Sequence, residues 1–203
     1  MNRIIKVGKN KGIPKKHLLE IVGMLKKGAS IIYPTETSYG MGCSIKSRKE
    51  IEKIYSLKGR EKEKDFVVLF SGKEMARKYG VISKEAEKLM EKFMPGALNL
   101  VVGKKKGKGN ICFRIPKHRI AFDLVKGLGE GLISTSCNKS GGEPIYSGKK
   151  AIKAFGGKID IIVDCGIIPK RKPSTIFDVK NKKVLRKGEI SEREILNVLD
   201  EKK

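Results

Sequence analysis

Two hydrophobic patterns alternate along the chain. In residues 17–27, four apolar side chains recur at the spacing of one helix face, and Gly28 follows as a stop signal. Residues 66–70 (FVVLF) form a short uninterrupted apolar run instead, which is typical of a strand buried on both faces. An alternation of such segments predicts a domain that combines helices with a mixed sheet.

The same patterns locate the remaining elements. Ser47 and Ser191 each stand three residues before a glutamate, so each is predicted to open a helix with a capping box. We expect helices over 17–27, 47–57, 83–93, 120–128, 151–155 and from 191 onward, and strands over 30–33, 66–70, 98–102, 111–115, 132–136, 159–164, 176–179 and 184–186. No repeat or long linker interrupts them, so residues 1–203 are predicted to form a single α/β (mixed α+β) domain.

Charge narrows the class of ligand. The chain carries 46 Lys and Arg against 22 Asp and Glu, a formal net charge of +24. Such an excess favours polyanions such as nucleic acid or nucleotides, or an acidic partner. A lysine-rich surface without any ligand, as in proteins adapted to heat or salt, explains the composition equally well.

Cysteine usage and hydropathy indicate the compartment. The four cysteines form no CxxC pair and the chain has two histidines, so neither a zinc site nor a disulfide framework is expected. No apolar run reaches the roughly 20 residues of a membrane span, and no signal peptide is recognisable. We therefore expect reduced thiols and a cytoplasmic protein without membrane contact.

Common fingerprints of nucleotide and acyl-transfer enzymes are missing. There is no GxxxxGK[ST] loop, and the glycines of 127–131 have the wrong spacing for a dinucleotide site. His17 and His118 lack the strand–turn–helix context of a hydrolase triad and are interpreted as surface residues. Any chemistry must therefore come from other polar clusters.

Five such clusters stand near the ends of predicted elements. Each cluster alone also has a purely structural explanation, such as a turn stabilised by a Ser or Thr hydroxyl, or basic residues that interact with a helix dipole. In chain order they are 34–43 (PTETSYGMGC), 58–60 (KGR), 134–142 (STSCNKSGG), 173–175 (PST) and 186–188 (RKG).

Together and in this order, the clusters resemble the motifs of the YrdC/TsaC family of threonylcarbamoyl-AMP synthases. The resemblance covers most of the chain, with a motif-bearing core of about residues 14–190. It implies a single-domain, short form of the family, with a twisted mixed sheet flanked by helices and a positively charged concave face.

The resemblance also implies an activity. Members are nucleotidyltransferases that condense L-threonine, bicarbonate or CO₂, and ATP into threonylcarbamoyl-AMP and pyrophosphate. A downstream threonylcarbamoyl-transferase complex then modifies adenosine 37 of tRNA (t6A). Mg²⁺ is expected to arrive with the phosphates of ATP, and the charge of the chain permits transient contact with tRNA.

Matching positions suggest roles for individual residues. Lys58 and Arg60 are the candidate catalytic cations. Arg114 suits the threonine carboxylate because its planar guanidinium can hold two oxygens. The candidate ATP-binding residues are Lys58, Arg60, Lys64, Ser134, Ser136, Asn138 and Arg186, and the candidate threonine-binding residues are Thr35, Arg114 and Ser174. For Glu36, a contact with Mg²⁺ or water and a solvated surface position remain equal alternatives.

Two other functions compete with this interpretation. A basic module that binds double-stranded RNA or tRNA without catalysis would use the same cations, although it would not need the hydroxyl clusters. A carbamoyl-transfer domain of hydrogenase maturation proteins is related in motif, but such domains sit in longer, cysteine-rich chains. The lysine-rich loop Lys104–Lys108 is interpreted as solvated rather than as an RNA contact.

Overall fold

The structure is a computed structural model of the whole chain. It describes residues 2–8, 11–61, 63 and 65–201. Among these residues, no helix is both long enough and apolar enough to cross a bilayer.

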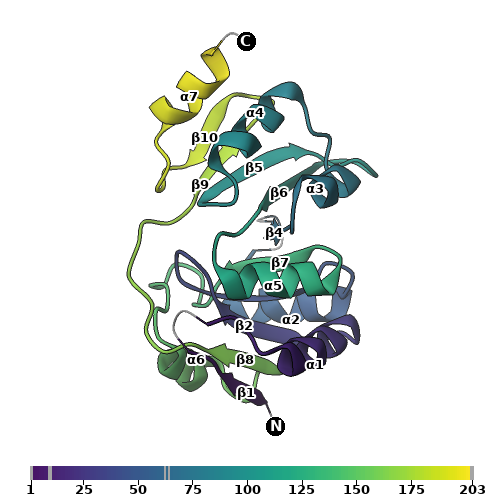
Figure 1. Cartoon of the computed structure of the whole chain (residues 1–203), viewed down its shortest axis with the longest axis vertical. Helices are drawn as coiled ribbons and strands as arrows, with labels where there is room; N and C mark the ends of the chain where they lie inside the picture. The colour runs from purple at the N-terminus through teal and green to yellow at the C-terminus, as the bar shows by residue number, and fades with distance from the viewer. Residues whose placement is uncertain (1, 9–10, 62, 64, 202–203) are drawn as a thin grey trace.

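One mixed sheet organises the molecule (Figure 1). Four of its neighbouring strand pairs are parallel and five are antiparallel. From one edge to the other the described strands are β1 (Arg3–Lys6), β8 (Ile161–Asp164), β2 (Ser30–Pro34), β3 (Tyr39–Ser44), β7 (Leu132–Ser136), β4 (Val67–Leu69), β6 (Asn110–Arg114), β5 (Leu98–Gly103), β9 (Thr175–Asp178) and β10 (Lys183–Arg186). The predicted single α/β domain with a mixed sheet is confirmed.

Helices cover the two halves of this sheet separately. In Figure 1, α1, α2, α5 and α6 surround the half from β1 to β7, whereas α3, α4 and α7 lie beside the half from β6 to β10. The described helices are α1 (Lys15–Lys26), α2 (Arg48–Lys58), α3 (Lys73–Tyr79), α4 (Lys84–Phe93), α5 (Arg119–Leu128), α6 (Gly148–Phe155) and α7 (Glu192–Asp200). Packing of α1 against α5 and of α4 against α7 completes the layers.

The core follows the central strands. Every residue of β2 and β3 is buried, and the largest enclosed side chains include Tyr33, Tyr39 and Phe113. Burial on both faces explains why β2 shows no polar alternation. At Gly42 of β3, a Cβ would lie 1.8 Å from the carbonyl oxygen of Ile133, so only glycine allows this close approach of β3 to β7.

The structure confirms most predicted elements and corrects one helix start. Ser191 makes the predicted capping box with Glu194, and the Ser83 side chain caps α4. Ser47 precedes α2 as expected, but its side chain makes no capping hydrogen bond, so the capping box predicted there is wrong. The pattern matched, yet Ser47 takes a backbone conformation (φ −87°, ψ 78°) outside the β region that capping residues usually adopt.

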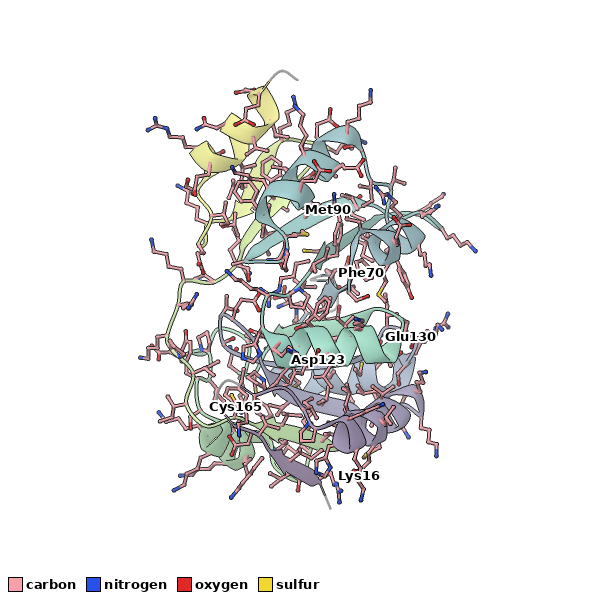
Figure 2. All side chains as sticks on the ribbon, viewed as in Figure 1. Lys16, Phe70, Met90, Asp123, Glu130 and Cys165 are labelled. Carbon is pink, nitrogen blue, oxygen red and sulfur yellow. The ribbon has the colours of Figure 1, made fainter. Side chains whose placement is uncertain are left out.

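Side chains of the basic residues spread over the whole molecule. Figure 2 shows nitrogen-tipped side chains around the entire outline of the ribbon rather than along one stripe. The loop Lys104–Lys108 is exposed, as predicted. All four cysteines are free thiols, and burial raises the pKa of Cys137 to about 12, which suits a packed residue and not a nucleophile.

Candidate functional site

A cavity of about 590 Å³ is lined by residues from all five motifs, and Arg60 is the one lining residue from the motif at 58–60. Its walls come from both halves of the sheet: the β2–β3 turn, β4, β5, β6, β7, the segment before β9, and β10. Polar lining residues from the motifs are Thr35, Thr37, Ser38, Arg60, Ser134, Thr135, Ser136, Ser174 and Arg186, and Arg114 of β6 joins them. Residues 35 and 186 thus share one cavity, although they are far apart in sequence.

The β2–β3 turn shapes one wall of the cavity. Thr35 Oγ1 donates to the carbonyl oxygen of Ser38 at 2.7 Å and accepts from the backbone N–H groups of Thr37 and Ser38. Its hydroxyl is therefore engaged within the turn, and Thr35 is 3% exposed. Thr37, which was not predicted, also lines the cavity. The motif therefore contributes to the cavity mainly through the shape of its turn, and the Thr35 hydroxyl serves to hold that turn.

Arg114, the last residue of β6, is the most enclosed cation of the cavity. It is 5% exposed, and its Nη1 donates to Ser174 Oγ and lies 3.2 Å from Glu36 Oε1. Its Nε is buried and has no hydrogen-bond partner among the described residues. A buried N–H without a partner is costly, so a ligand acceptor would be favoured here.

The last two motifs form a single unit. The Ser174 carbonyl oxygen accepts hydrogen bonds from Arg186 Nε at 3.0 Å and Nη2 at 2.8 Å. A Cβ on Gly188 would lie 2.3 Å from the carbonyl oxygen of Pro173 and 2.4 Å from the nitrogen of Thr175. The glycine of the motif at 186–188 is therefore required so that this segment can lie against the PST segment.

The electrostatics of the cavity favour an anion. Burial, and then the nearby positive charges of Arg114 and Arg60, lower the pKa of Arg186. Several guanidinium groups that repel one another are stabilised when a negatively charged ligand binds between them. Arg171, which the motif analysis missed, adds another guanidinium to the lining.

A second cavity of about 270 Å³ shares Arg60 and Ser136 with the first. Its other lining residues come from the end of α2 and the loop after β7: Lys58, Gly59, Glu61, Asn138, Ser140 and Gly141. The shared residues make the two cavities adjacent compartments of one site. A ligand with two parts could therefore occupy both.

Lys58 joins the two segments of this second cavity. Its Nζ donates to the carbonyl oxygens of Ser136 and Asn138, both at 2.6 Å, and its own carbonyl oxygen accepts from the N–H of Ser140. Burial, assisted by the charge of Arg60, lowers the pKa of Lys58 to about 8. An ammonium group has three N–H donors, and the described residues engage two of them, which leaves one for a ligand.

Asn138 and Ser134 are also placed by the fold. The Asn138 amide donates to the carbonyl oxygens of Lys139 and Gly142, which leaves its buried Oδ1 without a partner in the described structure. Ser134 Oγ accepts a hydrogen bond from Tyr33 Oη at 2.8 Å, so one of its hydrogen-bonding positions is already used by a core residue. Asn138 can thus still accept a hydrogen bond from a ligand.

The predicted site residues therefore lie together around the two cavities, apart from one that is outside the described residues. Every candidate site residue lines one of the two cavities except Lys64, which lies outside the described residues. Further lining residues that the motifs did not indicate are Asp65, Phe66, Val67, Asn99, Val101, Cys112, Pro144, Tyr146, Arg171, Ile176 and Leu185. Most of them are strand residues whose apolar pattern gives no sign that one face borders a cavity.

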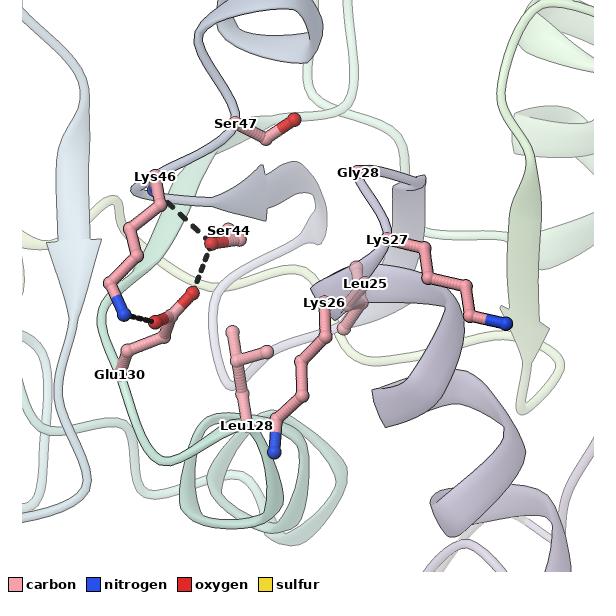
Figure 3. A pocket seen from close by; sticks show the side chains of 9 residues that line it. All are labelled: Leu25, Lys26, Lys27, Gly28, Ser44, Lys46, Ser47, Leu128 and Glu130. Atoms are coloured by element: carbon pink, nitrogen blue, oxygen red, sulfur yellow. Dashed lines mark hydrogen bonds and ion pairs between the residues drawn. The ribbon is translucent and has the colours of Figure 1, made fainter.

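A third cavity of about 530 Å³ lies away from the motifs (Figure 3). It is bordered by the ends of α1 and α5 and by Ser44, which ends β3, whereas the site lies near the start of that strand. The Glu130 carboxylate accepts a hydrogen bond from Ser44 Oγ and forms an ion pair with Lys46 Nζ. Its negative charge is therefore already balanced within the protein. The two motif-lined cavities are therefore the candidate functional site.

The chain is similar to several known proteins. Residues 23–188 match the Sua5/YciO/YrdC family model, described as "Telomere recombination". A threonylcarbamoyl-AMP synthase of Thiobacillus denitrificans is 31% identical over 80% of this chain and 90% of its own length. A putative threonylcarbamoyl-AMP synthase of Methanocaldococcus jannaschii is 31% identical over 91% of both chains.

A solved structure shows the same fold. The crystal structure of Sua5 from Pyrococcus abyssi complexed with L-threonine superimposes with a TM-score of 0.88 at 28% identity. The alignment covers 98% of this chain, which spans 61% of that protein.

Proposed function

The chain belongs to the Sua5/YciO/YrdC family, and on this premise we propose that it is a threonylcarbamoyl-AMP synthase. It condenses L-threonine, bicarbonate or CO₂, and ATP into threonylcarbamoyl-AMP and pyrophosphate. The observation that carries the proposal is the cavity in which Arg60, Arg114 and Arg186 meet, because two anionic substrates must be brought together there. The names of the curated relatives favour this function over an RNA-binding module without catalysis.

The larger cavity suits the amino acid. Arg114 and Ser174 form its threonine-binding pair in this proposal, with Arg114 Nε available to the substrate carboxylate. The turn at Thr35 supplies the wall beside it. Because the hydroxyl of Thr35 is engaged in the turn, we assign this residue the role of shaping the subsite.

The smaller cavity suits the phosphates of ATP. Lys58 and Arg60 supply positive charge there, while Ser136 and Asn138 supply polar contacts, and Arg186 borders the adjacent larger cavity. Lys64 and Ser134 complete the proposed nucleotide site. Among the described residues, no group of three or more His, Cys, Asp or Glu side chains could hold a metal ion. We therefore propose that Mg²⁺ is bound mainly by the ATP phosphates.

The proposed chemistry is positional. The amine of threonine adds to CO₂ and loses a proton, which gives N-carboxythreonine. A carboxylate oxygen of this product then attacks the α-phosphorus of ATP, and the bond to pyrophosphate breaks. Bringing these anions together is unfavourable in water, so fixed cations that meet the developing charge provide the catalysis.

The proposal includes a cellular setting. The substrates are cytoplasmic metabolites, so the chain would act in the cytoplasm and pass its product to a threonylcarbamoyl-transferase complex that modifies tRNA. Transient contact with tRNA is compatible with the charge of +24.

The decisive test is threonine-dependent release of pyrophosphate from ATP. We expect Arg60→Ala and Arg114→Ala each to lower kcat/KM by about 100-fold, the usual size for loss of a charge-stabilising group. Arg3→Ala, on edge strand β1, is the control and should retain activity. If both site variants keep near wild-type activity while folded, the site assignment is wrong.

A binding experiment separates the rival function. Under the proposal, L-threonine raises the affinity for ATP and L-serine does so much less. If RNA binds with a steep salt dependence while threonine affects neither ligand, the chain is an RNA-binding module instead.

A further inference from the structure

Glu36 is the one acidic residue of the first motif, and it does not line the cavity that its neighbours border. Thr35, Thr37 and Ser38 all border the 590 Å³ cavity, whereas Glu36 does not. Its side chain is 11% exposed. The solvated surface position considered for it is therefore wrong.

Two contacts hold this carboxylate behind the site. Glu36 Oε1 lies 3.2 Å from Nη1 of Arg114, and Oε2 accepts from the backbone N–H of His118 at 3.4 Å. His118 is the residue that caps the start of α5. Glu36 thus ties the end of β6 to the beginning of the next helix.

The ion pair has a clear electrostatic purpose. A guanidinium group buried to the degree of Arg114 is strongly unfavourable unless a counter-charge and hydrogen bonds accompany it. Glu36 supplies the counter-charge and Ser174 Oγ an acceptor, so Nη1 is held on two sides. The buried Nε has no partner among the described residues. Arg114 is therefore fixed at Nη1, while its Nε–H still lacks an acceptor.

We propose that Glu36 is a positioning residue for amino-acid binding. It fixes the guanidinium of Arg114 in the orientation that binds the carboxylate of the substrate. Little side-chain conformational entropy of Arg114 is then lost when the substrate binds. Glu36 itself does not touch the substrate. This inference rests on the proposed function, because it takes Arg114 as the group that binds the carboxylate of L-threonine.

The inference predicts an effect confined to one substrate. In Glu36→Gln the side chain keeps its size and one acceptor oxygen but loses its charge. We expect the KM for L-threonine to rise about 10-fold in this variant and about 30-fold or more in Glu36→Ala, because the buried guanidinium of Arg114 loses its counter-charge. The KM for ATP, and kcat at saturating L-threonine, should stay within about 3-fold of wild type.

A matched control separates positioning from general stabilisation. Glu50 is also a buried carboxylate, 6% exposed, and pairs with Lys53 at 3.0 Å outside both cavities of the site. Glu50→Gln should lower the melting temperature as Glu36→Gln does, yet leave the KM for L-threonine unchanged. Partial recovery in Glu36→Gln relative to Glu36→Ala would support orientation through the retained acceptor.

The outcomes are distinguishable. If folded Glu36→Ala has a wild-type KM for L-threonine, or if the KM values for ATP and threonine rise equally, Glu36 does not position Arg114 for the amino acid. Calorimetric titration of the wild-type chain with L-threonine and ATP provides the second readout. A wild type that neither binds nor consumes L-threonine overturns the proposed function, and this inference with it.

Discussion

Arg186 donates two hydrogen bonds to the main-chain carbonyl oxygen of Ser174, whose hydroxyl in turn accepts from Arg114. Ser174 thereby links two cations that arrive from different strands, and it does so with its backbone on one side and its side chain on the other. The positive charge of Arg114 still lowers the pKa of Arg186, so the two arginines repel each other while Ser174 holds both in place.

Removal of the Ser174 hydroxyl tests this link. Ser174→Ala removes the acceptor for Arg114 but leaves the carbonyl oxygen that binds Arg186. We expect the KM for L-threonine to rise about 10-fold, because a hydrogen bond to a charged group is lost at a buried site. Steady-state kinetics at saturating ATP measures it.

The control for this substitution is Ser83→Ala. It removes a helix cap remote from the cavities, so it should cost about 1 kcal/mol of stability without changing the KM for threonine. An unchanged KM in folded Ser174→Ala would show that its hydroxyl does not serve substrate binding.

Gly188 should tolerate no side chain. In Gly188→Ala the new Cβ would meet backbone atoms of Pro173, Ser174 and Thr175 at 2.3–2.5 Å, and main-chain atoms cannot rotate away. We expect a loss of about 2 kcal/mol or more in the free energy of unfolding and loss of activity, as the PST segment separates from Arg186. Urea denaturation and the pyrophosphate assay measure both.

Gly23→Ala serves as the counterpart. Nothing lies within 4 Å of a Cβ built there, in the middle of α1, so the change should stabilise the protein by about 0.5–1 kcal/mol. A Gly188→Ala protein as stable and active as wild type would contradict the packing described for the last two motifs.

Lys58 should give the enzyme an alkaline limit. Its pKa is lowered to about 8, so it is charged below that pH and loses its charge as the pH rises through it. The neutral amine can still donate to two carbonyl oxygens, but it no longer attracts phosphate. We therefore expect kcat/KM for ATP to fall above about pH 8.

The arginine substitution checks the origin of this limit. Arg stays charged throughout the accessible range, so Lys58→Arg should move the descending limb of the pH–rate profile to higher pH, whatever its effect on the plateau. If the limb stays at the same pH in a folded and active Lys58→Arg enzyme, another group causes it.

The exposed loop Lys104–Lys108 should be dispensable for catalysis. Replacing its four lysines with glutamine should leave the kinetic constants for ATP and threonine within about 2-fold, because exposed charges outside both cavities are screened by salt. A gel-shift titration with tRNA on the same variant measures the second role considered for it. A large loss of tRNA affinity would show that the loop is a contact surface and not merely solvated.

Patterns of local sequence predicted the elements with strong periodicity. Strand β7 has the predicted bounds, β5 and α5 differ by one residue at one end, and β6 is shifted by one residue. The strand β3 was missed because its sequence, YGMGCS, is rich in glycine, which disfavours a strand until a neighbour closes against it. Strand β1 and helix α3 were missed as well, since both are short and rich in charged residues.

The site was predictable where short motifs carry it, and not where long-range packing does. Ordered motifs were sufficient to nominate Ser174 and Arg186, and the resemblance to the family nominated Arg114. No local pattern could show that Glu36 lies behind Arg114, since 78 positions separate them and their contact depends on the register of the whole sheet. The engaged hydroxyl of Thr35 is likewise visible only once the turn is built.

The order of strands also affects when the site can form during synthesis. Strands β9 and β10 are last in sequence, yet β9 pairs with β5 in the middle of the chain and brings Ser174 and Arg186 to the cavity. A nascent chain that has emerged only as far as β8 lacks an entire wall of the site. Such non-local pairing is also slow to form, because the loop-closure entropy must be lost first. The ribosome-bound intermediate should therefore lack affinity for L-threonine, and the complete amino-acid subsite should appear only in a late step.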